Sequence, residues 1–583
     1  MDIHKIIKWV IPEFTLPRWI KSYNAKTAQF DALSGLTVAV MAIPQAMAYA
    51  ILAGVPAIYG LYASVVPLLI YPLFGTSRQL AIGVIAIDML IVSAGVGLIT
   101  SAGTEKYIAL VLILAIMVGI IQLLMSVLRL GFIVNLLSKP VILGFTAAAP
   151  IIIALSQLGN LLGMQVEHTS NIYATLETYW NNILTVNSIE AVIGIGAIII
   201  LLAFNRYYKK APKALIVIVA SGIVVWALQS NSFSINVVGD VPGGLPSFNI
   251  PDFQFSDLRR LLPTAITLAL VQFMTVISLG KTFGFEHGYS VRANNELFAL
   301  GSANIMSGLF QGLPASGSYS RSAINDDTGA KTPLSNIYAA LVVIITLLFL
   351  TPLLYFIPMS ALAAIIIVAA LGLINVKEVK ETFVAKERDG FIALFTFATV
   401  LLIGIQEGIL LGIAASLIDT LIRNSRPNLA VLGRVRGDRI FRDVAHFPGA
   451  QEIEGILVVR VDASFSFNNA EYMKRFILNK SDAKPITSVV VDGQSINDMD
   501  TTAIETLEMM IQDLKNSGIE LYFAGLKRPV REVMIRSGLA RKMGGQHFHL
   551  TPDKAVRYIL KKEEEQEDDE DDQRLERYQE GTD

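Results

Sequence analysis

Long apolar runs separated by short polar connections fill the chain from about residue 33 to residue 424. A helix needs about 20 apolar residues to cross the roughly 30 Å hydrocarbon core of a bilayer. The pattern therefore predicts fourteen membrane-spanning helices. They are expected near residues 33–53, 58–73, 83–99, 107–128, 135–157, 188–205, 212–230, 259–280, 294–310, 318–330, 334–354, 359–375, 391–405 and 407–423.

Basic residues occupy alternate loops between these runs. If the N-terminus is cytoplasmic, the inner loops carry Arg78, Arg129, Lys139, Arg206, Lys209, Lys210, Lys213, Lys281, Arg292, Lys377, Lys380, Lys386 and Arg388. The long outer loop 158–187 contains no Lys or Arg. Cytoplasmic loops are enriched in these residues, so both termini are expected in the cytoplasm and the protein in the cell membrane.

Composition supports an integral membrane protein, since 53% of residues are hydrophobic, 16% are charged and the mean hydropathy is +0.54. Residues 1–31 are polar and aromatic-rich, which predicts an interfacial segment and no cleavable signal peptide. Cysteine is absent and the six histidines show no paired ligand spacing, so we expect no disulfide and no metal site. Without an activated nucleophile or nucleotide loop, we expect neither enzyme activity nor a cofactor, and no nucleic-acid partner.

The composition changes after Arg423 to that of a soluble α/β domain. Apolar strands are predicted at 456–461, 487–492 and 521–524, and helices at 468–479, 501–517 and 528–537, giving a mostly parallel sheet. Residues 563–583 hold twelve acids and two bases and are expected to be disordered. The predicted parts are an N-terminal segment 1–31, a membrane domain 32–424, an α/β domain 425–562 and an acidic tail 563–583.

One hydroxyl-rich segment, 312–325, contains a single Arg among apolar spans. A cation at bilayer depth costs about 2.5–3.5 kcal/mol, so Arg321 should face protein or a cavity. Pro314 and Gly317 interrupt any helix, and a half-helix starting at Ser318 would point its free amides at one place. This pattern indicates an anion site. The alternative is that Arg321 neutralises a nearby carboxylate or extends to the membrane interface.

A second interruption, 75–83, leads into the third predicted span, as 312–325 leads into the tenth. Third and tenth are equivalent positions in two sets of seven spans. Interrupted helices at equivalent positions are typical of transporters whose binding site lies between two repeats, and an odd number of spans inverts the second copy. The sequence thus predicts 7+7 inverted repeats whose half-helices meet near the midplane. Taken alone, each break is also compatible with a simple packing role.

Several motifs together resemble the sulfate permease (SulP) family of anion transporters. They are Pro44-Gln45-Ala46-Met47-Ala48-Tyr49-Ala50, Leu52-Ala53-Gly54-Val55-Pro56, Tyr59-Gly60-Leu61-Tyr62, Phe74-Gly75-Thr76-Ser77-Arg78, Gly144-Phe145-Thr146-Ala147-Ala148, Asn295-Glu296-Leu297 and Ser318-Tyr319-Ser320-Arg321-Ser322. The soluble domain resembles the STAS domain that ends these proteins. The resemblance covers about residues 20–560 and implies a nucleobase-permease-like fold with core and gate domains.

The resemblance also implies which residues form the anion site. The matching positions are Gln45, Tyr49, Ile85, Ala86, Ser318, Tyr319, Ser320 and Arg321. The chemistry of these residues agrees with an anion site, because amides and hydroxyls donate hydrogen bonds to an oxyanion and Arg321 adds positive potential. Nucleobase permeases carry acidic residues in the eighth and tenth spans, and their absence at these positions weighs against a uracil-like substrate.

The sequence departs from the family where many members have an acid tied to cation coupling, because Thr275 occupies that position in the eighth span. Val84 also replaces the proline that often follows Gly83. Coupling to Na+ or H+ through the eighth span is therefore in doubt. Asp88, in the third span, is the substitute candidate: burial would favour its neutral form and let a proton and the anion enter together. The alternative is that Asp88 faces away from the site and hydrogen-bonds a neighbouring span.

The STAS-like domain contains a loop, 492–502, that follows a strand and opens a helix, with Asp500 as the expected N-cap. In soluble STAS proteins the matching position is phosphorylated, which makes Thr501 a candidate, although a purely structural cap is the simpler reading. A homodimer and a cytoplasmic partner for this domain are also expected from the resemblance.

These observations favour a secondary active transporter of a small anion such as sulfate, bicarbonate or a dicarboxylate. It would work by alternating access within the lipid bilayer, with a proton as the first candidate for the coupled ion. An uncoupled channel or exchanger remains an alternative because the eighth span lacks its acid, and so does a membrane-tethered STAS signalling protein.

Overall fold

The computed structural model describes residues 23–135, 138–164, 172–208, 213–228, 235–252, 254–372 and 374–562. The chain divides into two compact units, with the boundary between Ser416 and Leu417. The interfacial segment predicted for 1–31 lies mostly outside the described residues, and the acidic tail 563–583 lies entirely outside them.

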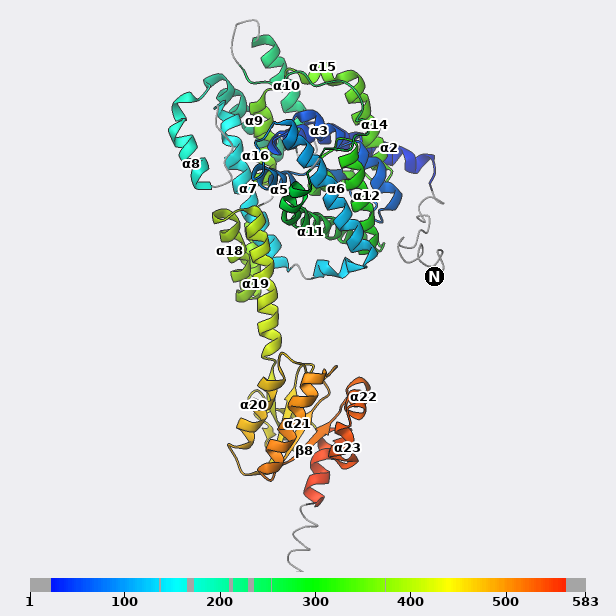
Figure 1. The fold of residues 1–583 in the computed structure, drawn as a ribbon, viewed down its shortest axis with the longest axis vertical. Helices are drawn as coiled ribbons and strands as arrows, with labels where there is room; N and C mark the ends of the chain where they lie inside the picture. The colour runs from blue at the N-terminus through cyan, green and yellow to red at the C-terminus, as the bar shows by residue number, and fades with distance from the viewer. Residues whose placement is uncertain are drawn as a thin grey trace, which may run out of the picture. The chain divides into compact units, whose positions relative to one another are not determined.

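The first unit is helical (Figure 1). Its elements are α2 (Ala25–Leu52), α3 (Ala57–Tyr62), α4 (Val66–Phe74), α5 (Ala86–Gly97), α6 (Glu105–Val127), α7 (Lys139–Leu162), α8 (Ile172–Asn181), α9 (Ser188–Tyr207), α10 (Lys213–Leu228), α11 (Phe255–Glu286), α12 (Ala293–Leu309), α13 (Tyr319–Asp327), α14 (Ser335–Ile345), α15 (Thr351–Leu354), α16 (Met359–Leu371), α17 (Val376–Ala385), α18 (Glu387–Leu402) and α19 (Ile405–Ser425), the last of which crosses the boundary.

Each of the fourteen predicted spans overlaps one or more of these helices. Nine stretches in the described part of the chain are long and apolar enough to cross a membrane. The count of fourteen thus stays a prediction, because the helices over predicted spans three and ten, α5 and α13, have only 12 and 9 residues. Two helices were missed: α8, in the predicted outer loop, and the Lys- and Glu-rich α17.

Small residues bring α6 and α12 into backbone contact, and Figure 1 shows the two helices side by side. A Cβ added at Gly119 would lie 2.6 Å from the carbonyl oxygen of Gly301. No larger side chain fits there, which is how helices in a membrane approach closely. Both helices also pack against α11, so α6, α11 and α12 form a rigid support beside α5.

The second unit contains a mixed sheet with the order β4-β3-β6-β7-β8-β9. Its strands are β3 (Leu429–Val435), β4 (Phe441–Asp443), β5 (Ala450–Gln451), β6 (Gly455–Val461), β7 (Ile486–Asp492), β8 (Glu520–Ala524) and β9 (Phe548–His549). Strands β6, β7 and β8 match the three predicted strands and are parallel, as expected; β9 is also parallel to β8, while β3 is antiparallel to β6. Strands β3, β4, β5 and β9 were not predicted.

The helices between these strands are α20 (Ala470–Ser481), α21 (Thr501–Asn516), α22 (Arg528–Arg536) and α23 (Leu539–Met543), and residues 552–562 are also helical. The three predicted helices, 468–479, 501–517 and 528–537, therefore match α20, α21 and α22 closely. Apolar side chains are buried on both faces of the sheet, which explains why its central strands are continuous Val and Ile runs.

Candidate anion site

The two interrupted segments meet. β1 (Ile82–Gly83) pairs antiparallel with β2 (Ser316–Gly317), so that Ile82 lies opposite Gly317. The pairing extends past the strands, because the Ser318 amide donates to the Ala81 carbonyl at 3.0 Å. Half-helices α5 and α13 begin within three residues of this ladder. Their first-turn amides, which lack acceptors inside the helix, therefore start from the same small sheet.

Arg321 lies in the first turn of α13 and is only 1% exposed. Its Nη2 donates to the carbonyl of Val84, the residue directly after β1, at 2.9 Å. Its Nε and Nη1 have no hydrogen-bond partner among the described residues, and no carboxylate there forms an ion pair with it. Both alternative readings of Arg321 are thus wrong for the described part of the chain. A buried cation with two free donors is suited to an anion.

Gly83 makes room for the guanidinium. A Cβ at this position would lie 3.0 Å from Nη2 of Arg321, and the backbone φ is +151°, where side chains are strained. Glycine at the end of β1 therefore serves a close approach between the backbone and Arg321.

Helix α2 supplies the polar side chains predicted for the site. Gln45 and Tyr49 are each 6% exposed, and Oε1 of Gln45 has no partner among the described residues. Tyr49 lies near Arg321. Helix α2 packs against both α5 and α13, which brings these two residues to the half-helices.

The remaining predicted site residues surround the two helix starts. Ser318 is the N-cap of α13, and its Oγ lies 3.5 Å from both the Arg321 amide and the Ser320 hydroxyl. Ile85 is the N-cap of α5, and Ala86 is its first residue. Tyr319 is 49% exposed and Ser320 is also exposed, so these two side chains lie outside the buried part of the site.

The two coupling candidates differ in their surroundings. Asp88 is fully buried, and its Oδ2 accepts a 2.9 Å hydrogen bond from Gln272 of α11, while Oδ1 has no partner among the described residues. The contact with α11 is the one expected if Asp88 faces a neighbouring span. Thr275 donates to the Val271 carbonyl of its own helix at 2.9 Å.

Glu296 belongs to one of the family motifs and had no predicted role, and the structure gives it a structural one. The fully buried carboxylate accepts hydrogen bonds from the Tyr71 hydroxyl, the Thr76 amide and hydroxyl and the Ser77 amide, at 2.5–3.2 Å. It fixes the turn that leads toward β1. Sequence patterns could not predict this contact, because Glu296 and Thr76 are 220 residues apart in the chain.

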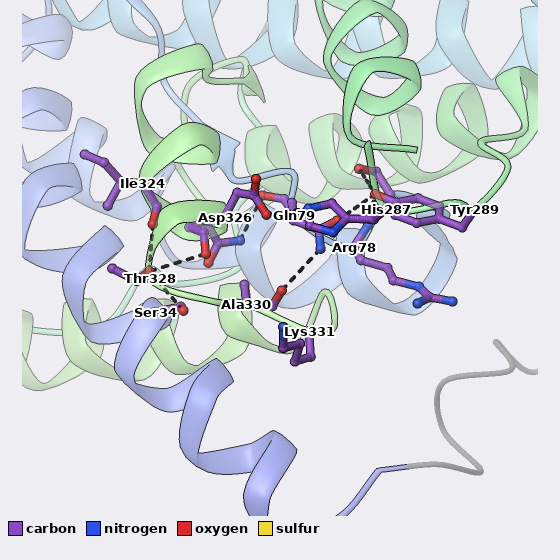
Figure 2. Close-up of polar contacts among 12 residues, drawn as sticks. Ser34, Arg78, Gln79, His287, Tyr289, Ile324, Asp326, Thr328, Ala330 and Lys331 are labelled. Atoms are coloured by element: carbon purple, nitrogen blue, oxygen red, sulfur yellow. Dashed lines mark hydrogen bonds and ion pairs between the residues drawn. The ribbon is translucent and has the colours of Figure 1, made fainter. Parts of the chain in front are cut away.

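Gln79 braces the segment before β1 from the other side. Figure 2 shows it reaching toward Tyr289, whose hydroxyl donates to Gln79 at 2.7 Å, and toward the Ala330 carbonyl. Asn325, near the end of α13, donates to the Gln79 carbonyl at 2.8 Å. The base of the half-helix pair is therefore held by a hydrogen-bonded frame.

Glu286, His287 and Asp326 also come together near this frame, with ligand atoms within 4.8 Å of one another. The sequence could not show this group because Asp326 follows His287 by 39 residues. His287 and Asp326 satisfy each other at 2.7 Å, as Figure 2 shows, and both Glu286 and His287 are exposed. An exposed, mutually paired group is an ordinary surface contact.

In the α/β unit, Asp500 is the N-cap of α21, as predicted. Its Oδ1 accepts from the Ala503 amide at 2.8 Å and its Oδ2 from the Phe467 amide at 2.7 Å. Thr501, the phosphorylation candidate, is exposed at the first position of the helix. Nearby, burial raises the pKa of the Asp492 carboxyl at the end of β7.

Comparison with known proteins gives two family matches. The model of the sulfate permease family matches residues 29–396, and that of the STAS domain matches residues 448–555. The chain is 34% identical to a protein named sulfate transporter 4.1, chloroplastic, from Arabidopsis thaliana, over 95% of this chain and 84% of that one. It is also 34% identical to a probable sulfate transporter from Mycobacterium tuberculosis, over 94% of this chain and 99% of that one.

Solved structures share the fold. The murine Solute Carrier 26 family member A9 anion transporter, in its inward-facing state, has a TM-score of 0.87 at 22% identity and covers 96% of this chain and 94% of its own. The transmembrane domain of a cyanobacterial bicarbonate transporter, BicA, has a TM-score of 0.59 at 25% identity and covers 68% of this chain and 98% of its own. These likenesses confirm the predicted transporter fold followed by a STAS domain.

Proposed function

The chain belongs to the sulfate permease family of anion transporters, as its motifs predicted, and from this premise we propose that it is a secondary active transporter of a small oxyanion. The observation that carries the proposal is the buried guanidinium of Arg321, which has two donors without a partner among the described residues. In this proposal the anion takes those donors, and the first-turn amides of α5 and α13 add positive potential. The relatives are named as transporters and not as enzymes, which agrees with the expectation that the chain has no enzyme activity.

Gln45 and Tyr49 complete the proposed site from α2. The Gln45 amide has donors and an acceptor, and Tyr49 offers a hydroxyl beside Arg321. Ser318 contributes a hydroxyl, and Ile85 and Ala86 contribute backbone amides. Exposed Tyr319 and Ser320 would meet the anion on its way in rather than in its bound position.

The substrate is proposed as sulfate or bicarbonate, with dicarboxylates next. Sulfate is supported by the names of the 34% identical relatives, and bicarbonate by the name of the BicA neighbour. All three classes present oxygen acceptors to a guanidinium, which binds them in the same way. Transport by alternating access is part of the proposal, because transporters whose interrupted helices carry a site between two repeats work in this way.

Coupling to protons is proposed to use Asp88. A neutral Asp88 removes a buried charge from a helix that contributes to the anion site, so protonation favours the loaded state. Thr275 has a hydroxyl and no charge, so it cannot take up a coupled proton as a carboxylate in the eighth span would.

The test is uptake of labelled sulfate, bicarbonate and fumarate into proteoliposomes, with and without an inward proton gradient. Wild type should accumulate one anion above equilibrium when the gradient is present, and Arg321→Ala should not. Arg206→Ala, which removes an exposed cation on α9, is the matched control and should behave like wild type. Flux that only equilibrates would favour an uncoupled channel or exchanger, and no flux at all would favour a signalling role.

We also propose the topology and the location of the protein. It lies in the cell membrane, with both termini in the cytoplasm. The chain has no cysteine, so single cysteines can report the side of each loop without background. Ser101→Cys should react with an impermeant maleimide from outside and Glu286→Cys only after permeabilisation. The reverse pattern would contradict the orientation.

The STAS domain is proposed to mediate homodimer assembly and to bind a cytoplasmic partner. Phosphorylation at Thr501 is the less favoured option, because a phosphate there would lie beside the Asp500 cap, whose two oxygens are already occupied. Cross-linking of full-length protein in membranes tests the dimer, and an unchanged monomer band would contradict it.

A further inference from the structure

Three amide side chains form a closed, buried network next to Asp88. Gln122 of α6, Gln272 of α11 and Asn304 of α12 are all fully buried. Nε2 of Gln122 donates to Oε1 of Gln272 at 3.0 Å, and Nδ2 of Asn304 donates to Oε1 of Gln122 at 3.0 Å and of Gln272 at 2.9 Å. We call these three residues the amide relay. It ends at Asp88 on one side and at the backbone before β2 on the other.

The backbone end fixes the orientation of every amide in the relay. The Ala315 amide can only donate, and it donates to Oδ1 of Asn304 at 2.7 Å. Nδ2 of Asn304 must therefore donate onward, which makes Oε1 of Gln272 the acceptor. Nε2 of Gln272 is left to face Asp88, and turning this amide over would oppose donors to donors.

Asp88 consequently receives a donor and is offered no acceptor by the relay. Its Oδ2 accepts from Gln272 at 2.9 Å, and its Oδ1 has no partner in the described part of the chain. A buried carboxylate with a single hydrogen bond is an uncompensated charge, whereas a neutral carboxyl leaves one weakly polar group unpaired. The surroundings thus favour the neutral acid.

No charged group among the described residues offsets this. Helices α2, α6, α7 and α11 pack against α5. Their titratable side chains are Lys26, Asp31, Tyr49, Glu105, Lys106, Tyr107, Lys139, Asp257, Arg259, Arg260, Lys281 and Glu286. Among the described contacts none of them bonds to Asp88, and Arg321 bonds to Val84 instead.

We propose that burial holds Asp88 neutral and that the amide relay links its protonation to the position of β2. Strand β2 leads directly into α13, and its partner β1 leads to the carbonyl that holds Arg321. Ionisation of Asp88 would pull more strongly on Gln272 and, through Asn304, on the Ala315 amide. Gln272 and Asn304 are then positioning residues for proton-linked transport, an inference that rests on the proposed role of Asp88.

Infrared difference spectroscopy tests the relay without measuring transport. The full-length wild type at neutral pH should show the C=O band of a protonated carboxyl, and Asp88→Asn should lack it. In Gln272→Met the band should move to higher frequency, because the carbonyl no longer accepts a hydrogen bond. Gln157→Met, a buried amide replaced on α7, is the matched control and should leave the band unchanged. Absence of the band in wild type, or an unmoved band in Gln272→Met, would overturn the proposal.

Two further readouts address the link to transport and to β2. Loss of the Gln272 donor disfavours the charged form, so the pH at which proton-driven uptake is half-maximal should rise by about one unit, a tenfold change in protonation. Amide exchange over residues 313–318 should be faster in Gln272→Met than in Gln157→Met. Should Gln272→Met fail to fold, Gln272→Asn, whose shorter amide cannot reach Asp88, makes the same predictions.

Failure of the relay can be told from failure of the proposed function. If wild-type uptake ignores the proton gradient, proton coupling is wrong, while the infrared band still tests the relay. If Asp88→Asn abolishes proton dependence and Gln272→Met changes neither the band nor the uptake midpoint, coupling stands and the relay is wrong.

Discussion

Replacing Arg321 by Met should stabilise the empty protein and remove anion binding at the same time. Wild type buries a guanidinium whose Nε and Nη1 have no partner among the described residues. A buried unpaired polar group costs about 1–3 kcal/mol, so the two together cost about 2–6 kcal/mol. Met fills a similar volume without polar atoms.

The substitution also has a cost, which sets the net magnitude. The Val84 carbonyl loses its 2.9 Å donor, and one unpaired acceptor costs about 1–3 kcal/mol. Taking the middle of both ranges, Arg321→Met should gain about 2 kcal/mol, or a rise of about 1–2 °C in the unfolding midpoint of a chain this size.

The assay is thermal unfolding of purified full-length protein in detergent, with and without sulfate or bicarbonate. At an anion concentration of about 100 times Kd, wild type should gain about 2.7 kcal/mol, and Arg321→Met should gain nothing. Arg206→Met, an exposed cation on α9, should change neither the midpoint nor the anion effect. A variant that is less stable than wild type without anion and still responds to anion would refute the reasoning.

Three other substitutions follow from the structure. Gly83→Ala places a Cβ 3.0 Å from Nη2 of Arg321 and should weaken anion affinity about tenfold, or about 1.4 kcal/mol, seen as a raised KM for uptake; an unchanged KM would contradict the close approach. Burial raises the pKa of Asp492, so the stability it contributes is present at low pH and lost as pH rises through the folded-state pKa. Asp492→Asn should thus slow amide exchange in β7 at pH 7, with the difference fading toward pH 4, and equal effects at both would count against it. Asp500→Ala removes the cap on the Ala503 amide and should destabilise the start of α21 by about 1–2 kcal/mol, seen as faster exchange there, whereas unaltered protection would mean that the cap contributes little.

Local signals in the sequence were strong where one residue type decides the backbone. The break before α13 was predictable because Pro314 and Gly317 cannot continue a helix, and the start at Ser318 because hydroxyls cap helices. The central strands of the α/β unit were predictable because buried parallel strands are continuous apolar runs. Helix α17 was missed because its lysines and glutamates hide a short amphipathic pattern.

The meeting of the two interrupted segments was predicted from their equivalent positions in two sets of seven spans, but the residue pairing between them was not. Ile82 pairs with Gly317 across more than two hundred residues, and no local pattern in either segment indicates that register, because it depends on packing between segments far apart in the chain. The same holds for the amide relay, because a Gln or Asn within an apolar helix indicates an interhelical hydrogen bond but not its partner. The two alternatives for Arg321, a nearby carboxylate or the membrane interface, were wrong for the same reason. Its hydrogen-bond partner is the carbonyl of Val84, which lies in the other set of seven spans.

In the membrane unit, the number of hydrogen bonds that a buried polar side chain makes distinguishes structural residues from the proposed functional ones. The buried carboxylates of Asp31 and Glu296 accept three and four hydrogen bonds respectively, so they are fully compensated and hold loops in place. Gln45, Asp88 and Arg321 are also buried, yet each keeps an atom without a partner in the described part of the chain, as do Asn325 and Ser360. Four of these five residues lie on α2, α5 and α13, the helices that carry the proposed site, whereas Ser360 lies on α16. Because a fold tolerates uncompensated buried polar atoms only where something else is gained, the gathering of four of them on these three helices is the strongest physical argument that the anion binds there.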